Sequence, residues 1–537
     1  MLFLEPLPML APSRLLTVAA VAASASVHAA DAPVSTQWGQ VSEPSLPAAS
    51  AVCKTLPATL TPSGGSIDSA DGNPANSQPN TADIQSAIDN CPSGQAVKLV
   101  KGASGQTGFL TGPLQLKSGV TLWIDTGVTL FASRNPKDYD NGPGTCGTAT
   151  KTNDKACKPL ILADKTSKSG IVGGGTIDGR GGSLLTNGAN ANARTWWDVA
   201  WQNRSSGLYQ QNPRLLQIQN GSNLTLYGVT LQNSPNFHIW AYGVTGLTAW
   251  GIKILTPSLA YTKAGYACPS GTTPDVVTPA TCFTPDTTQN TDGFDTGYAS
   301  NVLLAYSYIS AGDDHVAIKS SNSPGASNHT YAHNHFYYGH GLSIGSETNA
   351  GVTNIAVTDL TMDGFDSGTS GGLRIKSDAS RGGKVSNVTY SQVCMRNISA
   401  PLTFDPFYSA SKGSLYPSFI DITVRNVHNL GSSKYQGGKL AFAGYALNGQ
   451  NNPLKLTLDN VVFDGTQPTF VDAHNGGPAS PANTQFTFGP GPVSFSSSIV
   501  TSSNNGVTVT GSPGSGTGID CSAAFVPLKS VLSASPI

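Results

Sequence analysis

Short segments in which apolar and polar residues alternate follow one another along most of the chain. Several share a polar start, most often an asparagine, and end at a turn of Gly, Ser, Asn or Asp; they begin at Asn223, Asn301, Asn354, Asn387 and Leu456. Alternation with a period of two is typical of β-strands. The repeat length of roughly twenty to thirty-five residues lies in the range of solenoid architectures.

Many short strands fit either a sandwich or barrel, or a right-handed parallel β-helix. Helical crossovers are absent from the pattern, and the repeats vary in length without losing their strand–turn–strand order. Both observations favour the β-helix, in which successive coils stack about 4.8 Å apart and residues distant in sequence align in rows. We therefore predict an all-β fold, a single-stranded right-handed parallel β-helix over residues 66–537.

An amphipathic helix is predicted before these repeats, at residues 80–91. Apolar side chains recur there at i, i+3, i+4 and i+7: Ile84, Ala87, Ile88 and Cys91. Asn80 or Thr81 can cap its first turn. We expect this helix to cover the first coil, whose open edge would otherwise invite aggregation. It is the one convincing amphipathic helix in the sequence.

Two segments precede the predicted solenoid. In residues 1–30, Arg14 precedes an apolar run and small residues then lead to Ala29-Ala30, which is typical of an export signal. Residues 31–65 are rich in Pro, Ser and Ala, and this composition predicts a linker or a loosely ordered arm.

The chain contains 8 cysteines. An even number in an exported protein suggests disulfides, although their connectivity cannot be deduced from the sequence. Pairing of neighbours would give Cys53–Cys91, Cys146–Cys157, Cys268–Cys282 and Cys394–Cys521. Two of these pairs would staple the polar, Pro-rich segments 133–160 and 256–289, which interrupt the repeat and are predicted to project as loops. The second loop leads directly into the polar motifs described below, so we expect it to wall one side of their groove. No Cys-x-x-Cys pair or histidine cluster supports zinc.

Charge is sparse and balanced. Charged residues make up 11% of the chain, and its formal net charge is -1. This balance gives no electrostatic basis for nucleic-acid binding, and a polyanionic ligand would have to be held by local cations. No segment after the N-terminus is apolar enough to span a bilayer. We expect a secreted monomer without a membrane anchor.

Against this low charge, polar motifs follow one another in order: Asn290-Thr291-Asp292, Gly312-Asp313-Asp314, Gly339-His340-Gly341 and Arg374-Ile375-Lys376. Hydrolysis of a glycosidic bond needs one protonated carboxyl beside the leaving oxygen and one carboxylate that activates water, about 6.5–9.5 Å apart in an inverting enzyme. Asp292 and Asp313 are 21 positions apart, close to one coil, so they can lie on adjacent coils. Each motif alone could instead be a turn or an Asx cap.

The spacing within the motifs predicts a shared groove. Strict alternation would direct Asp313 and Asp314 to opposite faces, so both reach one groove only if the backbone bends, and Gly312 would permit the bend. Repulsion within a carboxylate cluster raises at least one pKa. Arg374 and Lys376 share one strand face and suit a carboxylate ligand, through a bidentate contact and a point charge.

Taken together, the motifs resemble those of glycoside hydrolase family 28, the pectin-degrading polygalacturonases. The architectural similarity covers residues 50–470, and the ordered motifs are its specific part. One departure is His315, which stands where the family commonly has a cysteine. The resemblance implies a hydrolase that cleaves α-1,4-galacturonosyl linkages of polygalacturonate or pectin by inversion, with no metal or other cofactor.

The resemblance also assigns roles. Asp313 is expected to be the general acid, while Asp292 and Asp314 position and deprotonate water. His340 is expected to hold the hydrogen-bond network of the protonated aspartate, or the sugar at the cleavage point. The residues expected to bind substrate are Asn290, Arg374, Lys376 and Tyr408. The match of Tyr408 is looser, and packing in the core is its alternative role.

Other functions fit the predicted fold less well. A pectate lyase would use a calcium-binding acid cluster with an arginine base, which the ordered Asp and His motifs disfavour. A rhamnogalacturonan hydrolase shares fold and mechanism but resembles these motifs less. A non-catalytic glycan-binding solenoid would leave the clustered acids without a role. Within the family we favour endo over exo action, because no added module that would close the groove is evident.

Overall fold

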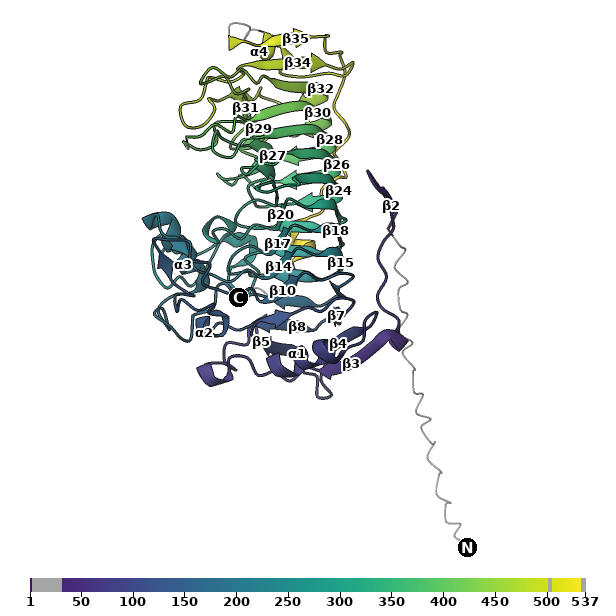
Figure 1. Cartoon of the computed structure of the whole chain (residues 1–537), viewed down its shortest axis with the longest axis vertical. Helices are drawn as coiled ribbons and strands as arrows, with labels where there is room; N and C mark the ends of the chain where they lie inside the picture. Colours follow the sequence, from purple (N-terminus) through teal and green to yellow (C-terminus); the bar gives the residue numbers. More distant parts are fainter. Residues whose placement is uncertain (2–30, 411, 501–504, 533–537) are drawn as a thin grey trace.

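The alternating segments form strands that pair in parallel, each with its equivalent in the next coil. The computed structural model describes residues 1, 31–410, 412–500 and 505–532, and in it these strands stack as one long column (Figure 1). The predicted parallel β-helix is confirmed. Apart from Met1, the predicted export signal lies outside the described residues.

Within the described residues, an 11-stranded sheet and a 20-stranded sheet form the walls of the column. The smaller sheet consists of β6 (Leu114–Gln115), β10 (Ile161–Asp164), β14 (Leu216–Gln219), β17 (Ile239–Tyr242), β20 (Phe294–Gly297), β23 (Val316–Lys319), β25 (Leu342–Gly345), β27 (Gly371–Lys376), β29 (Ala400–Asp405), β31 (Lys439–Phe442) and β33 (Thr469–Phe470). The larger sheet consists of β3 (Val52–Pro57), β4 (Ala96–Val100), β5 (Gly108–Thr111), β7 (Thr121–Ile124), β8 (Thr129–Ala132), β11 (Gly170–Val172), β12 (Thr176–Asp178), β15 (Ser222–Tyr227), β16 (Thr230–Gln232), β18 (Thr245–Trp250), β19 (Lys253–Leu255), β21 (Ser300–Ala305), β22 (Tyr308–Ser310), β24 (Ala326–Phe336), β26 (Val352–Asp363), β28 (Lys384–Arg396), β30 (Ser418–Asn429), β32 (Leu454–Phe463), β34 (Thr484–Phe488) and β35 (Thr508–Thr510).

The core is a stack of inward-facing aliphatic side chains. Val316 and Ile318 of β23 pair in register with Leu342 and Ile344 of β25, and all four are fully buried. The side chains between them point outward, so each coil adds one layer to the core and one row to the outer face.

The recurrent asparagines form a ladder near the starts of strands β21, β24, β26 and β28 of the larger sheet. Asn301, Asn328, Asn354 and Asn387 have φ between 54° and 59°, a left-handed conformation that asparagine tolerates. The side-chain amides of Asn328, Asn354 and Asn387 each donate to the amide oxygen of the asparagine on the preceding coil, with N···O distances of 3.1, 3.0 and 2.7 Å. The polar start of each repeat therefore satisfies backbone geometry and links neighbouring coils.

The predicted cap is helix α1 (Thr81–Asn90), which buries Ile84 and Ile88 against the first coil. Asn80 is its N-cap residue, but its side chain makes no capping bond. Instead its Oδ1 accepts the backbone N–H of Leu110 in β5 at 2.8 Å. The side chain expected to cap the helix thus joins it to the sheet.

Helix α3 (Trp196–Ser206) was not expected from the sequence. Its buried residues lie in the first turn and a half, so it lacks the regular apolar stripe by which amphipathic helices are found. A capping box between Thr195 and Asp198 is the local signal that marks its start. The remaining described α-helices are short: α2 (Pro136–Tyr139), α4 (Ser496–Val500) and α5 (Leu528–Val531). No described helix combines the length and the hydropathy that crossing a bilayer requires.

The structure differs from the linker or loose arm predicted for residues 31–65. Strands β1 (Val34–Thr36) and β2 (Gly39–Val41) form a hairpin that packs on the larger sheet, with Val34 buried beside Trp250. β3 pairs with β4, so the solenoid begins before residue 66. Val34, Trp38 and Val41 of this Pro- and Ser-rich segment pack on the column around Trp250, which the average composition of the segment does not reveal.

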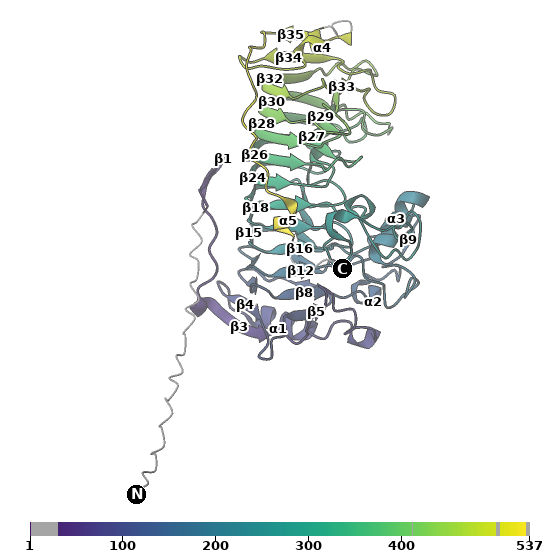
Figure 2. The ribbon, with the colours of Figure 1, turned by 180° about the vertical axis from the view of Figure 1, so that it is seen from behind.

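The C-terminal segment returns along the outside of the column. It passes β30, where the Ile519 carbonyl lies 2.7 Å from His428 Nδ1, and is joined to β28 by the Cys394–Cys521 disulfide. Helix α5 then packs near Tyr266 and Tyr337, and Figure 2 shows it beside the middle of the column. The segment assigned to the solenoid by sequence is therefore a strap across several coils.

All four disulfides predicted by pairing neighbours are present: Cys53–Cys91, Cys146–Cys157, Cys268–Cys282 and Cys394–Cys521. The first joins α1 to β3. The second and third staple the predicted loops, which project from the column together with α2 and α3 (Figure 1). In the 256–289 loop, Tyr261, Ala280 and Phe283 pack on Trp197 of α3.

Candidate active site

The polar motifs meet where the chain enters successive strands of the 11-stranded sheet. Asp292 precedes β20, Asp313 and Asp314 precede β23, and His340 precedes β25. These strands are direct neighbours. The Gly293 N–H donates to the Asp314 carbonyl at 2.9 Å, which links the two acidic turns. The expectation that the motif acids occupy adjacent coils is confirmed.

The backbone bends at Gly312–His315, between β22 and β23, as the two adjacent aspartates require. Glycine is needed at position 312 for space. A Cβ there would lie 2.0 Å from the Thr288 carbonyl oxygen and 2.6 Å from that of Pro285. The end of the 256–289 loop is therefore pressed against the acidic turn, and the predicted wall of the groove is in contact with the motif.

Asp313 is held from two sides. Its Oδ1 lies 3.0 Å from His340 Nδ1, and its Oδ2 accepts from Asn290 Nδ2 at 3.2 Å. Its own carboxylate also accepts the Asp314 N–H at 2.9 Å. Burial opposes ionisation, but the attraction and hydrogen bond of His340, together with Lys376, outweigh it and hold the pKa of Asp313 well below its usual value.

The carboxylate of Asp314 accepts hydrogen bonds from three side chains. Lys376 Nζ lies 2.7 Å from Oδ2, while Arg374 Nη1 and Ser343 Oγ lie 3.1 and 3.0 Å from Oδ1. Arg374 Nη1 also donates to the His340 carbonyl at 2.7 Å. Burial opposes ionisation here too, but Lys376 and Arg374 lower the pKa of Asp314. The two cations predicted to bind substrate thus already share a carboxylate within the protein.

Asp292 has the opposite surroundings. It is 4% exposed, and among the described residues its Oδ1 has no hydrogen-bond partner. Loss of solvation, followed by the charges of Asp313 and Asp295, raises its pKa well above the usual value. Lys319 is a nearby cation, but its Nζ forms an ion pair with Asp295 at 3.1 Å. Of Asp292, Asp313 and Asp314, only Asp292 therefore lies in surroundings that favour the protonated form.

Tyr408 lies at the far side of Lys376, whose Nζ is 5.0 Å from the centre of its ring. The ring also meets His474 edge to face, at a centroid distance of 6.0 Å. His474 is hydrogen-bonded to buried Asp405, and this bond raises the pKa of His474. Sequence analysis missed His474 and Asp405, because neither stands in a motif and they are joined only by the fold.

Aromatic and cationic side chains lie on the coils before the acids. Trp240 and Tyr242 of β17 stack at 3.8 Å, and the Arg214 guanidinium lies 4.3 Å from the Trp240 ring. In register, Trp240 pairs with Asp295 of the next coil. Sequence analysis did not single out these residues. Their spacing at i and i+2 on a strand beside the motif was the available signal.

His315, the departure from the family motif, is a buried support for the site. Its ring stacks on Phe336 at 4.8 Å, and its Nδ1 accepts the Gly341 N–H at 3.1 Å. A Cβ at Gly339, where φ is +153°, would lie 2.6 Å from this ring. Burial lowers the pKa of His315 to about 4, so the ring is neutral and supports the turn that carries His340.

The carboxylates and His340 lie close enough together to be considered as ligands of a metal ion. Ligand atoms of Asp313, Asp314 and His340 lie within 4.8 Å of one another. Lys376 and Arg374 already neutralise Asp314, and a divalent cation would have to displace them or face their repulsion. The donor set is thus better suited to hydrogen-bonding chemistry than to holding a metal.

The structure brings all the predicted site residues into one cluster: Asp292, Asp313, Asp314, His340, Asn290, Arg374, Lys376 and Tyr408. Their arrangement supplies one accessible carboxyl, two nearly buried ones and two cations on β27, the second strand beyond β23. This is the set that glycosidic hydrolysis of an acidic sugar requires.

Known proteins are similar to this chain in sequence and in fold. A model described as glycosyl hydrolases family 28 matches residues 91–473. A polygalacturonase of Ralstonia solanacearum is 68% identical over 524 residues, which cover 97% of this chain and 99% of that protein. An endo-polygalacturonase of Pectobacterium carotovorum subsp. carotovorum is 42% identical over 390 residues, covering 72% and 85% of the two chains. The solved structure of the polygalacturonase from Erwinia carotovora ssp. carotovora matches with a TM-score of 0.64 and 38% identity, over 80% of this chain and 96% of that one.

The family model covers every coil that carries the acidic motifs, and the sequence identity to the Ralstonia polygalacturonase extends over nearly the whole chain. The resemblance expected from the motifs is therefore confirmed, and the chain belongs to glycosyl hydrolases family 28.

Proposed function

We propose that this glycoside hydrolase cleaves α-1,4-galacturonosyl linkages within polygalacturonate chains. The observation that carries the proposal is the cluster of carboxyl groups beside Arg374 and Lys376, on successive coils of one sheet. The carboxyls supply the acid and base of hydrolysis, and the cations suit a substrate that carries a carboxylate on every sugar.

In this proposal Asp313 donates the proton to the leaving oxygen. Its side chain is 20% exposed, whereas that of Asp314 is 4% exposed, so Asp313 can reach an oxygen of a bulky substrate. Asp292 and Asp314 accept hydrogen bonds from a water, and one of them takes its proton as the water attacks the anomeric carbon. The glycosidic C–O bond breaks on the opposite side, and the anomeric centre is inverted.

Substrate binding would place the proton where it is needed. In the free protein burial raises the pKa of Asp292, whereas His340 and Lys376 outweigh burial and lower the pKa of Asp313. A galacturonate carboxylate near Lys376 would reduce the part that this cation plays, beside His340, in lowering the pKa of Asp313. The proton then favours Asp313, and Asp292 becomes the base. Because the carboxyls interact, they titrate as a unit.

Internal cleavage is supported by the position of the acids along the column. Trp240, Tyr242 and Arg214 lie on coils before them, while Arg374, Lys376 and Tyr408 lie on coils after them. Sugars on both sides of the scissile bond would therefore meet aromatic faces or cations. The Pectobacterium relative with 42% identity is named an endo-polygalacturonase, which agrees with this choice. Exo action and rhamnogalacturonan hydrolysis are the alternatives.

The protein is proposed to be secreted and to act as a monomer on pectic polysaccharide. The N-terminal pattern of residues 1–30 and the four disulfides support export, because disulfides persist in oxidising compartments.

A product profile on de-esterified polygalacturonate tests the activity and its direction. Early loss of viscosity with a range of oligomers is expected, and Asp313→Asn should abolish both signals without unfolding the protein. Galacturonate monomer as the sole early product would contradict internal cleavage. Cleavage of rhamnogalacturonan with polygalacturonate left intact would contradict the proposed substrate.

A further inference from the structure

A chain of hydrogen bonds leads from outside the solenoid to Asp313. Asn212 Nδ2 donates to Gln210 Oε1 at 2.8 Å, and Gln210 Nε2 donates to Asn290 Oδ1 at 2.9 Å. Asn290 Nδ2 then donates to Asp313 Oδ2 at 3.2 Å. Gln210 lies outside the four motifs and belongs to the short strand β13 (Tyr209–Gln210), not to a coil of the column.

The direction of these bonds is fixed at their start. Asn212 Nδ2 also donates to the Trp196 carbonyl at 2.7 Å, and a carbonyl can only accept. The amide nitrogen of Asn212 must therefore point toward Gln210, which receives it with Oε1 and presents Nε2 to Asn290. As a result Asn290 directs its own N–H group at the carboxylate of Asp313.

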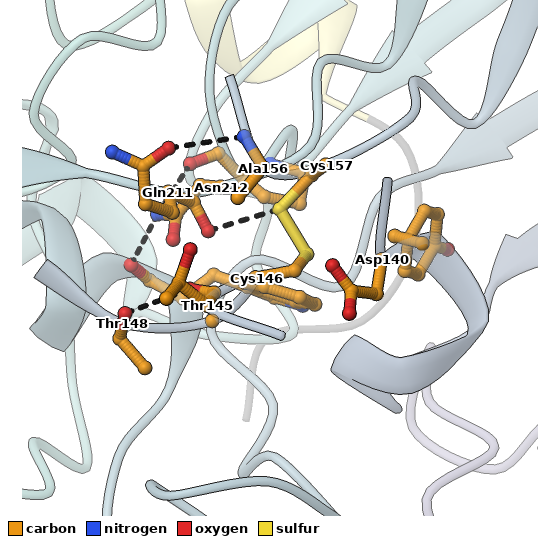
Figure 3. The surroundings of a disulfide bond; sticks show 12 residues. Asp140, Thr145, Cys146, Thr148, Ala156, Cys157, Gln211 and Asn212 are labelled. Atoms are coloured by element: carbon orange, nitrogen blue, oxygen red, sulfur yellow. Dashed lines mark hydrogen bonds between the residues drawn. A yellow bond between two sulfur atoms is a disulfide. The ribbon is translucent and has the colours of Figure 1, made fainter. Parts of the chain in front are cut away.

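The disulfide loop holds β13 in place. β13 pairs antiparallel with β9 (Ala149–Thr150), which lies between Cys146 and Cys157 in the sequence. Figure 3 shows Gln211 at the disulfide, where its Oε1 accepts the Ala156 N–H at 3.1 Å. The Gly147 N–H donates to the Gln211 carbonyl at 2.7 Å. Gly147 and Ala156, the sequence neighbours of the two cysteines, thus both bind Gln211, the residue next to Gln210.

We infer that Gln210 is a positioning residue that makes Asn290 a hydrogen-bond donor to Asp313, and that the Cys146–Cys157 loop keeps Gln210 in place. The inference rests on the proposed hydrolysis of polygalacturonate. We call the hydrogen bonds from Asn212 through Gln210 and Asn290 to Asp313 the relay. A donor at Asp313 stabilises its ionised form, so the relay opposes protonation of Asp313 in the free protein. It also orients the carboxyl toward the leaving oxygen.

Gln210→Glu reverses the relay. A carboxylate at this position still accepts from Asn212 but has no donor for Asn290. Asn290 then turns its N–H group toward Glu and its Oδ1 toward Asp313, which favours the protonated form. We expect kcat to fall about 10-fold, the effect of losing a hydrogen bond to a charged group, with little change in KM. The alkaline limb of the kcat/KM profile should move to higher pH.

Three further variants distinguish the loss of the relay from the effect of added charge and test the part played by the disulfide loop. Gln210→Met keeps the length of the side chain without donor or acceptor, and it should lower kcat to a similar extent. Gln485→Glu adds the same charge on an exposed position of β34 and should leave the profile unchanged. In Cys146→Ser/Cys157→Ser the profile should shift in the same direction as in Gln210→Glu.

The measurements are kcat, KM and pH profiles on de-esterified polygalacturonate, with melting temperatures as a check of folding. Gln210→Glu and Gln210→Met proteins that are as active as the parent, with the same pH profile, would overturn the inference. An unchanged profile in the double-serine variant would contradict the part played by the loop. A parent protein that does not cleave polygalacturonate would instead refute the proposed function.

Discussion

Asp292 and Asp314 occupy equivalent places in neighbouring coils, yet their surroundings are opposite in charge. Both stand in the turn before a strand of the 11-stranded sheet, and both are nearly buried. Asp314 is bonded to Lys376, Arg374 and Ser343, and its pKa is lowered. Asp292 lacks a cation of its own, and its pKa is raised well above normal.

The difference shows how a repetitive fold can produce unlike sites from like positions. The coils fix where the two carboxyls lie, while the side chains of the following coils decide their charge. Lys376 and Arg374 of β27 form ion pairs with Asp314. The charged neighbours of Asp292 are Asp295 and Lys319, which form an ion pair with each other. Carboxyls whose pKa values are driven apart can hold and release one proton between them.

The largest expected effect comes from removing either carboxylate. Asp292→Asn and Asp314→Asn should each lower kcat by about 10²–10⁴-fold, the range for loss of general acid or base catalysis. The double variant should lose little more than either single variant, because both groups serve one water. Steady-state kinetics on polygalacturonate measures this, and multiplicative losses would show that the two carboxyls act in separate steps.

The same two variants should differ in stability. Asp314→Asn leaves Lys376 and Arg374 without their carboxylate at a nearly buried place, and breaking a buried ion pair from one side costs about 3–5 kcal/mol. Asp292→Asn removes an acid without a cationic partner, whose burial raises its pKa, so the variant should be at least as stable as the parent at neutral pH. Denaturant unfolding at neutral pH gives both values. Equal losses would remove the contrast between the two sites.

Lys376→Met tests whether the cation serves substrate as well as Asp314. Cleavage of polygalacturonate should fall at least about 10-fold, since a charged hydrogen-bonding partner of the galacturonate carboxylate is lost. Methyl-esterified pectin has no carboxylate to pair, so it should be a poor substrate for the parent and little worse for the variant. Kinetics on both substrates decide the matter, and equal proportional losses would restrict Lys376 to supporting Asp314.

The smallest effects are the pH dependences of folding. The contribution of Asp292 is present below the ordinary aspartate pKa of 3.8 and is lost as pH rises through its raised pKa. The contribution of Asp314 is present above that ordinary value and is lost as pH falls through its lowered pKa. Subtracting each Asn variant from the parent should give slopes of opposite sign, at most about 1.4 kcal/mol per pH unit. Unfolding curves collected from acid to neutral pH would contradict the assignments if both slopes had one sign.

The residues that sequence analysis found are those with a local pattern. Alternation predicted the coils, the spacing of Ile84 and Ile88 predicted the cap, and the motifs predicted Asp313 and its partners. Pairing each cysteine with its neighbour in the sequence predicted the disulfides, and it also gave Cys394–Cys521, which are 127 positions apart.

The residues that it missed depend on contacts between distant segments. Gln210 reaches Asn290 across 80 positions, and His474 reaches Asp405 across 69. Helix α3 escaped because its buried residues cluster at one end. The pairing of Lys376 with Asp314 also required the fold, since the sequence showed only that two cations shared a face.

The stereochemistry of the first product tests most directly whether these carboxyls act through water. Proton NMR of polygalacturonate during the first turnovers distinguishes the anomers before they equilibrate. Water activated by Asp292 or Asp314 attacks opposite the leaving group, so the α-linkage should yield the β-anomer at the new reducing end. An initial α-anomer, or a trapped glycosyl–enzyme ester on one of the aspartates, would contradict the account.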